Sequence, residues 1–209
     1  MRLKLITLEV GPWPMNCYLL IDEQARTAAV VDPGADAERI LGMVKDYQVV
    51  AILLTHAHAD HIGALGEIKA ATGAPVYLHP ADAEKFGVAY DRPLADGQEI
   101  SIGAHRLLAI HTPGHTPGIT CFFLGDGRVI VGDTLFVGGP GRTWSAEDFA
   151  LSLQTMRDKV FTWPDDTQFY PGHGPSGLIA HERPAFETFL QSYQEGGLPP
   201  DLHGDVTWE

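Results

Sequence analysis

Short segments in which apolar residues alternate with polar ones, or follow one another almost without a break, recur along the chain and predict β-strands separated by turns. Residues 49–55 are nearly all apolar, as in a strand that is buried on both faces. Other strands are predicted at residues 2–9, 17–22, 28–32, 76–78, 106–110, 119–124, 129–131 and 168–170.

Between these strands lie segments whose apolar residues recur at helical spacing. Asp36 stands where a helix N-cap is expected, and Ser145 with Asp148 three positions later forms a capping-box pattern. The predicted helices cover residues 37–47, 61–71, 149–160 and 184–194. Strands mixed with crossover helices predict an α/β layered domain, although the pattern alone does not say which one.

The length of 209 residues fits one domain whose core holds together without disulfides. No linker or low-complexity stretch divides the chain. We therefore predict a single domain over residues 1–195 and a loosely ordered C-terminal tail over residues 196–209, which are rich in Gly, Pro and Asp. Cys17 and Cys121 both lie in apolar runs and are predicted to be buried free thiols.

The formal net charge of −13 argues against a nucleic-acid partner, because binding phosphates requires a basic face. The first residues lack the apolar stretch of a secretory signal, and the longest apolar run, residues 49–54, is far too short to span a bilayer. We therefore expect a cytoplasmic location with no membrane partner. The sequence leaves the oligomeric state open.

One segment is unusually rich in potential metal ligands. His56, His58, Asp60 and His61 fall within six residues, directly after the predicted buried strand. Residues two apart in an extended segment point the same way, so His56 and His58 can bind one ion together. Asp60 and His61 lie where a helix begins and can face a second ion. If these four residues were there only for packing, their occurrence together in one short segment would be a coincidence four times over. The motif therefore predicts metal binding.

Three further residues share one context, a strand end followed by a Gly-rich loop. His115 lies between two predicted strands, and Asp133 and His173 each follow one. Each alone could be an ordinary turn residue. A zinc ion is usually bound by about four ligands, however, and the four residues of the first motif are too few for two ions. As a set, the three residues would complete two coordination shells.

The His-x-His-x-Asp-His pattern, followed by Gly-His, Gly-Asp and Gly-His pairs, resembles the metallo-β-lactamase superfamily, and within it the small hydrolases similar to glyoxalase II. The resemblance covers nearly the whole chain, from residue 31 to residue 174, and implies an αββα sandwich. By position it implies two metal ions. The first would be bound by three histidines, His56, His58 and His115. The second would be bound by Asp60, His61 and His173, and Asp133 would bridge the two ions.

Three other residues acquire roles from the same resemblance. Asp32 matches the buried aspartate that supports the metal loop from behind and orients its ligands. Arg142 lies near the position where glyoxalase II-like enzymes use a basic residue to contact the thiol carrier, although a surface ion pair is an equal alternative. Trp13, in the stiff apolar loop over residues 11–15, would either wall the substrate cleft or plug the core. Many relatives have Asp where this chain has Trp144.

The resemblance implies a metal-dependent hydrolase with a small-molecule substrate. It implies two divalent ions, most readily zinc, with iron or manganese as alternatives. The two ions would share a water, and the resulting bridging hydroxide, oriented by Asp60, would attack a carbonyl. A thioester of the hydroxyacylglutathione type suits this chemistry, because a thiolate leaves without an acid to protonate it; a lactone or another ester is also compatible. Only 36 residues follow His173, fewer than the helical extension that helps glyoxalase II bind glutathione.

Three alternatives stay open. A persulfide dioxygenase-like oxidoreductase of the same fold would bind a single iron through His56, His115 and Asp133. The Pro-Gly-His-Gly sequence around His173 favours a hydrolase over it. The net charge and the lack of an inserted domain disfavour a nuclease, and the presence of all seven ligand positions disfavours a non-catalytic metal-binding module.

Overall fold

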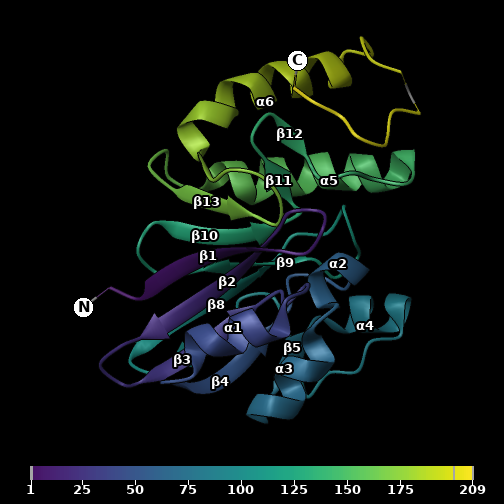
Figure 1. The fold of residues 1–209 in the computed structure, drawn as a ribbon. Helices are drawn as coiled ribbons and strands as arrows, with labels where there is room; N and C mark the ends of the chain where they lie inside the picture. The colour runs from purple at the N-terminus through teal and green to yellow at the C-terminus, as the bar shows by residue number, and fades with distance from the viewer. Residues whose placement is uncertain (1, 200, 209) are drawn as a thin grey trace.

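The computed structural model describes residues 2–199 and 201–208 of the chain. Two six-stranded sheets pack against each other, and helices cover the outer face of each sheet (Figure 1). These four layers form an αββα sandwich, which confirms the predicted fold.

The first sheet is mixed in strand direction. Antiparallel pairs join its first three strands, and parallel pairs join the third strand to the rest of the sheet. In order across the sheet the strands are β1 (Lys4–Val10), β2 (Met15–Asp22), β3 (Thr27–Val31), β4 (Gln48–Leu53), β5 (Val76–Leu78) and β6 (Arg92–Pro93).

The second sheet is antiparallel except where β10 pairs with β13 in parallel. In order its strands are β14 (Gly177–Leu178), β13 (Gln168–Pro171), β10 (Arg128–Gly132), β9 (Thr120–Phe123), β8 (His105–His111) and β7 (Glu99–Ile102). A small separate hairpin follows β10, formed by β11 (Leu135–Phe136) and β12 (Gly139–Pro140).

The helices divide between the two outer layers. On the side of the first sheet lie α1 (Ala37–Val44), α2 (Ala59–Ile62), α3 (Leu65–Thr72) and α4 (Pro80–Phe86). On the side of the second sheet lie α5 (Ala146–Asp158), the 3₁₀ turn η1 (Val160–Thr162) and α6 (Ile179–Gln194).

Three hydrophobic clusters fill the spaces between the layers, and β2 shows how one strand serves two of them. Cys17 and Leu19 point into the cluster beneath α1 and α3, whereas Tyr18 and Leu20 point into the cluster between the sheets. Successive side chains of a strand face opposite sides, so a strand inside a sandwich must be apolar on both faces. The third cluster lies between the second sheet and α5 and α6.

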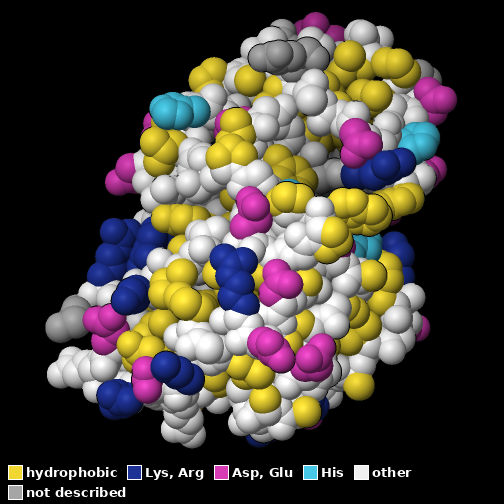
Figure 2. All heavy atoms as spheres, viewed as in Figure 1, with side chains coloured by type: hydrophobic (Ala, Val, Ile, Leu, Met, Phe, Trp, Pro, Cys, Tyr) yellow, Lys and Arg dark blue, Asp and Glu magenta, His cyan; other side chains and the backbone are white. Residues whose placement is uncertain are grey.

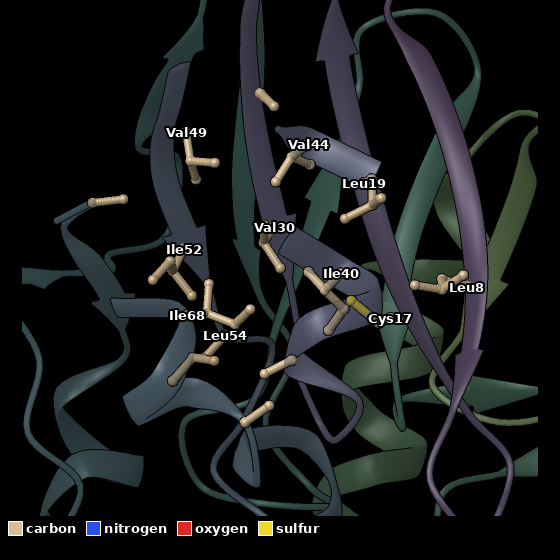
Figure 3. Close-up of a cluster of buried hydrophobic side chains, with 14 of the residues drawn as sticks. Leu8, Cys17, Leu19, Val30, Ile40, Val44, Val49, Ile52, Leu54 and Ile68 are labelled. Atoms are coloured by element: carbon tan, nitrogen blue, oxygen red, sulfur yellow. The ribbon is translucent and has the colours of Figure 1, made fainter. Parts of the chain in front are cut away.

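Figure 3 shows the first of these clusters, in which the strand side chains of Leu19, Val30 and Ile52 lie beside Ile40 of α1 and Ile68 of α3. All five side chains are fully buried. The two helices therefore pack on the sheet through the same apolar residues whose helical spacing predicts these helices from the sequence.

All four predicted helices differ from the structure at their ends, and two of the differences are large. One helix is predicted over residues 61–71, but the structure has α2 and α3. The helix is interrupted between them, because the Ala64 N–H donates a hydrogen bond to the Pro33 carbonyl (2.9 Å) and not to a carbonyl of α2. The prediction begins the last helix at Pro184, whereas α6 begins at Ile179 and contains Pro184.

The two predicted helix caps have different outcomes. Ser145 caps α5 as predicted, since its hydroxyl accepts a hydrogen bond from the Asp148 N–H (3.1 Å). Asp36 precedes α1, but its carboxylate accepts from the Gly11 N–H (3.1 Å) and makes no cap hydrogen bond.

The C-terminal segment, for which the sequence predicts loose order, has no helix or strand over residues 201–208 but returns to the body of the protein. Gly204 pairs with Thr143 through two backbone hydrogen bonds, of 2.9 and 3.2 Å. Trp208 is buried against the rings of Phe186 and Phe189 on α6. Burial of this large ring is the physical reason that the segment packs where its Gly and Pro content alone predicts a free tail.

Among the described residues, every helix is too short or too polar to cross a membrane. On the face drawn in Figure 2, Lys and Arg side chains lie singly or in small groups, interspersed with acidic and hydrophobic ones.

We expect Ile40→Ala to lower the free energy of unfolding by about 2–5 kcal/mol, because the cavity would lie in the packed layer between α1 and the first sheet. Met43→Ala is a matched control on the same helix, where the side chain is 42% exposed, and should change it by no more than about 0.5 kcal/mol. Urea denaturation measures both values. Similar losses in the two variants would show that α1 does not bury its apolar face as described.

Candidate metal centre

The seven predicted ligands meet at one edge of the sandwich, where strands of both sheets end. His56 and His58 follow β4 of the first sheet, and Asp133 and His173 follow the parallel strands β10 and β13 of the second. His115 lies in the loop between β8 and β9. Residues far apart in the sequence are thereby brought together, as their shared strand-end context predicts.

A first group consists of His56, His58 and His115, whose ring nitrogens converge. Nδ1 of His58 lies 3.0 Å from Nε2 of His56 and 3.0 Å from Nε2 of His115. His58 thus faces the group with Nδ1, and the other two histidines face it with Nε2. His56 is completely buried and His115 nearly so.

Hydrogen bonds on the outer side of two of these rings show where their protons lie. Nδ1–H of His115 donates to the Arg142 carbonyl (2.8 Å), which can only accept. The Thr55 hydroxyl donates to Asp32 (2.6 Å), so its oxygen accepts from Nδ1–H of His56 (3.0 Å). The inner Nε2 atoms of these two neutral rings therefore carry lone pairs, which is the form that binds a metal.

A second group, made of Asp60, His61 and His173, lies beside the first. Nε2 of His173 is 3.1 Å from Asp60 Oδ2, and Nδ1–H of His173 donates to the Pro14 carbonyl (2.9 Å). The ligand atoms of the three residues lie within 4.8 Å of one another.

Asp133 lies between the two groups. One carboxylate oxygen is 3.4 Å from Nε2 of His61, and the other is 3.6 Å from Nε2 of His115 and 3.9 Å from Nε2 of His173. This is the position of a residue that contacts both groups.

Asp32 supports the centre from behind and is fully buried. Its carboxylate accepts from the Thr55 N–H (2.7 Å), from the Thr55 hydroxyl and from Nδ1–H of His61 (3.0 Å). Because it lies on the outer side of His61, it orients this ring and, through Thr55, the ring of His56.

The loop that carries His173 is held by β2. The Asn16 side-chain amide donates to the carbonyls of Pro171 (3.0 Å) and Gly174 (2.9 Å), on either side of the histidine. No spacing in the sequence pointed to Asn16, since it lies more than 150 residues away from the loop that it binds.

Two observations show that the residues fit bound divalent metal. His61 Nε2 and Asp133 Oδ1 are buried and, apart from the 3.4 Å approach between them, which lacks hydrogen-bond geometry, have no partner among the described residues; a cation would relieve this costly arrangement. Gly172 leaves the space beside them open, because a Cβ there would overlap Asp133 Oδ1 and lie 2.6 Å from the His61 ring. Lone pairs that converge on a space kept free of side chains are suited to divalent cations.

The two groups differ in the direction in which the pKa values of their histidines are shifted. Burial holds the pKa values of His56 and His58 below their ordinary range and lowers the pKa of His115 to about 4. Burial also opposes protonation of His61, but Asp133 and Asp32 raise its pKa to about 10. The hydrogen bond to Asp60 raises the pKa of His173. Without metal, the first group is therefore neutral at pH 7, whereas His61 of the second group is protonated.

Two residues proposed as substrate contacts lie on different sides of the centre. Arg142 lines a cleft of about 330 Å³ together with His115, Asp133 and His173, and its guanidinium pairs with Asp205 (3.2 Å). Trp13 is 79% exposed and lies by a hollow of about 260 Å³ whose lining is mostly apolar and includes Asp60. Trp13 therefore does not plug the core.

The structure adds two features that the sequence did not reveal as part of the site. The C-terminal segment walls the cleft of Arg142 with Asp205, Val206 and Thr207. Trp144, which is half exposed, lies against the rings of His58 and His115 at 5.2 and 5.3 Å between ring centroids.

We expect metal binding to release protons unequally. An ion in the second group must displace a proton from His61, whose raised pKa of about 10 lies above this range, so its affinity should rise as the pH increases from about 6 to 8, while the affinity of the first group changes less. Calorimetric titration with zinc in buffers of different ionisation enthalpy counts the protons released for each ion. Equal proton release at both ions would contradict this assignment.

Comparisons with known proteins agree with these features. A family model described as the metallo-beta-lactamase superfamily matches residues 10–191. The probable metallo-hydrolase YqgX of Bacillus subtilis is 35% identical over 198 residues, which cover 84% of this chain and 92% of that protein. Hydroxyacylglutathione hydrolase GloC of Haemophilus influenzae is 31% identical over 198 residues, with 84% and 93% covered.

Solved structures show the same likeness. ETHE1 from Myxococcus xanthus has a TM-score of 0.77 at 30% identity, with 94% of this chain and 92% of that chain covered. TTHA1623, solved in a di-iron-bound form, has a TM-score of 0.71 at 30% identity, with 85% and 96% covered.

Proposed function

Because the chain belongs to the metallo-β-lactamase superfamily, whose members are mostly metallo-hydrolases, we propose that it hydrolyses a small-molecule thioester of the hydroxyacylglutathione type with two bound divalent ions. The first ion would be held by His56, His58 and His115, and the second by Asp60, His61 and His173, with Asp133 shared between them. Zinc is our first candidate. Iron is the alternative, since TTHA1623 was solved with two iron ions.

The observation that carries this proposal is the completeness of the second group. A single-iron oxygenase needs only three protein ligands, for which His56, His115 and Asp133 would be enough. Asp60, His61 and His173 have no role in such a site, yet their ligand atoms lie within 4.8 Å of one another beside it. When bound, two divalent ions supply Lewis acidity and lower the pKa of a water that they share.

The residues of the chain supply orientation and a polar environment. Outer hydrogen bonds fix the rings of His56, His61, His115 and His173, so that none of them is free to turn away from the centre. Asp60 is partly exposed at the mouth of the site, where its carboxylate can accept a hydrogen bond from the attacking water and orient it. Because a thiolate is a good leaving group, this reaction needs no acid from the protein.

The cleft beside the centre is suited to a substrate that carries a carboxylate. Arg142 presents its guanidinium there at 57% side-chain exposure, and a planar guanidinium binds a carboxylate through two parallel hydrogen bonds. GloC, at 31% identity, is named for a glutathione thioester, and glutathione carries carboxylates. These two facts together support glutathione as the thiol carrier.

We expect the zinc-loaded protein to release glutathione from lactoylglutathione, and the iron-loaded protein to consume no oxygen with glutathione persulfide. His173→Ala should lower kcat/KM for the thioester by at least about 100-fold, because it removes a ligand of the second ion. Thiol release is followed with a disulfide reagent and oxygen uptake with an electrode. His181→Ala, which changes an exposed histidine on α6, is the matched control and should be fully active.

The oxidoreductase alternative gives the opposite result. A single-iron site on His56, His115 and Asp133 would consume oxygen with the persulfide and would keep that activity in His173→Ala. Observing this pattern with the iron-loaded protein would replace the proposed hydrolase.

We also expect Asp205→Asn to lower KM for lactoylglutathione by up to about fivefold, because an exposed ion pair of this kind is worth no more than about 1 kcal/mol and competes with the substrate for Arg142. Arg142→Ala should raise KM, and kcat should change little in either variant. Steady-state kinetics measures both.

Asp158→Asn, which breaks the exposed Arg157–Asp158 pair on α5, is the control for a change of surface charge. If Asp205→Asn raised KM as Arg142→Ala does, Asp205 would be a substrate contact itself and not a competitor.

A further inference from the structure

Asp82, on α4, is a fully buried carboxylate outside the seven ligands. It accepts three hydrogen bonds: from the Ala57 N–H (3.0 Å), from the Thr116 hydroxyl (3.0 Å) and from the Gly118 N–H (2.6 Å). A carboxylate without exposure to water is costly unless its lone pairs are satisfied in this way. Its three partners come from two different loops.

The sequence positions of these partners connect Asp82 to all ligands of the first ion. Ala57 lies between His56 and His58, so the Asp82 bond fixes the backbone of the extended segment that carries both. Thr116 directly follows His115. Asp82 therefore joins the β4–α2 loop to the β8–β9 loop. Among the described residues its partners are the neighbours of the ligands and not the ligand side chains themselves.

The packing around Asp82 leaves little freedom. A Cβ at Gly118 would lie 2.7 Å from the Asp82 backbone nitrogen and 2.8 Å from its carboxylate oxygen, so the second loop can approach α4 this closely only with glycine there. The second group of ligands is supported by other residues, since His61 bonds to Asp32 and His173 to Pro14.

We propose that Asp82 is a positioning residue for the first metal ion: by binding both loops, it holds His58 and His115 at the separation at which their inner nitrogens can share one cation. The inference rests on the metal sites of the proposed function and does not depend on its substrate. It predicts that loss of the Asp82 carboxylate weakens the first ion selectively.

Asp82→Asn is the sharpest variant, because it keeps the shape but turns an NH₂ group towards one of the N–H donors. The matched control is Asp22→Asn. Asp22 is also buried and accepts three backbone hydrogen bonds, from residues 24, 25 and 104, but it lies away from the ligands. Thr116→Val, which removes only the hydroxyl donor, is a milder second variant in case Asp82→Asn does not fold.

Zinc affinity is measured by competition with a chromophoric chelator in two backgrounds. In His173→Ala, where the first group is the complete one, Asp82→Asn should weaken zinc binding roughly 10–100-fold, Thr116→Val less, and Asp22→Asn by no more than about threefold. In His58→Ala, where the second group is complete, Asp82→Asn should have no more effect than Asp22→Asn. Thermal unfolding of the metal-free proteins reports the purely structural cost.

Two results would overturn the assignment. Equal effects of Asp82→Asn and Asp22→Asn in the His173→Ala background would make Asp82 a structural residue only. Equal weakening of both groups by Asp82→Asn would show general loosening. If the unmodified chain bound zinc but released no thiol, the proposed substrate would fail and the role of Asp82 would stand; if it bound no zinc, both would fail.

Discussion

The ligand atoms of five imidazoles and two carboxylates point towards one small volume at the edge of the two sheets. Such an arrangement is unfavourable by itself, because the inner nitrogens of His56 and His115 face Nδ1 of His58 without enough protons between them. Asp133 and His61 likewise keep buried polar atoms without hydrogen-bond partners among the described residues. The remaining structure must therefore hold these groups in place from outside, and divalent cations are the species that would make their proximity favourable.

The fold provides this outside support through strand ends and a few buried hydrogen bonds. Parallel strands β10 and β13 bring Asp133 and His173 to the same edge, and β4 delivers His56 from the other sheet. Asp32 then fixes the outer side of His61 and, through Thr55, of His56. A buried carboxylate can accept several hydrogen bonds at once, so one side chain holds several donors in fixed positions.

The convergence of the seven residues is predictable because the information is local. His56, His58, Asp60 and His61 lie in one short segment after a buried strand, and the resemblance that their spacing carries also points to His115, Asp133 and His173. A contact is not predictable where the partner is distant in the sequence. Asn16 binds a loop more than 150 residues away, and α4 was not predicted as a helix, so Asp82 carried no visible signal. The packing of Trp208 likewise depends on Phe186 and Phe189, which periodicity places on a helix but not beside the C-terminal segment.

Arg142 links the candidate metal centre to the cleft beside it through two different parts of one residue. Its carbonyl accepts the proton of His115 Nδ1 and so orients a ligand, while its guanidinium lies in the cleft and pairs with Asp205. The backbone N–H and carbonyl of the next residue, Thr143, both form hydrogen bonds with the backbone of Gly204 in the C-terminal segment. That segment is anchored in turn by the buried ring of Trp208. The backbone of Arg142 is thus held by hydrogen bonds, whereas its guanidinium is half exposed. On the proposed function, a substrate would draw the guanidinium away from Asp205 without disturbing His115, so the cleft would adapt to its ligand while the metal ligands stay in place.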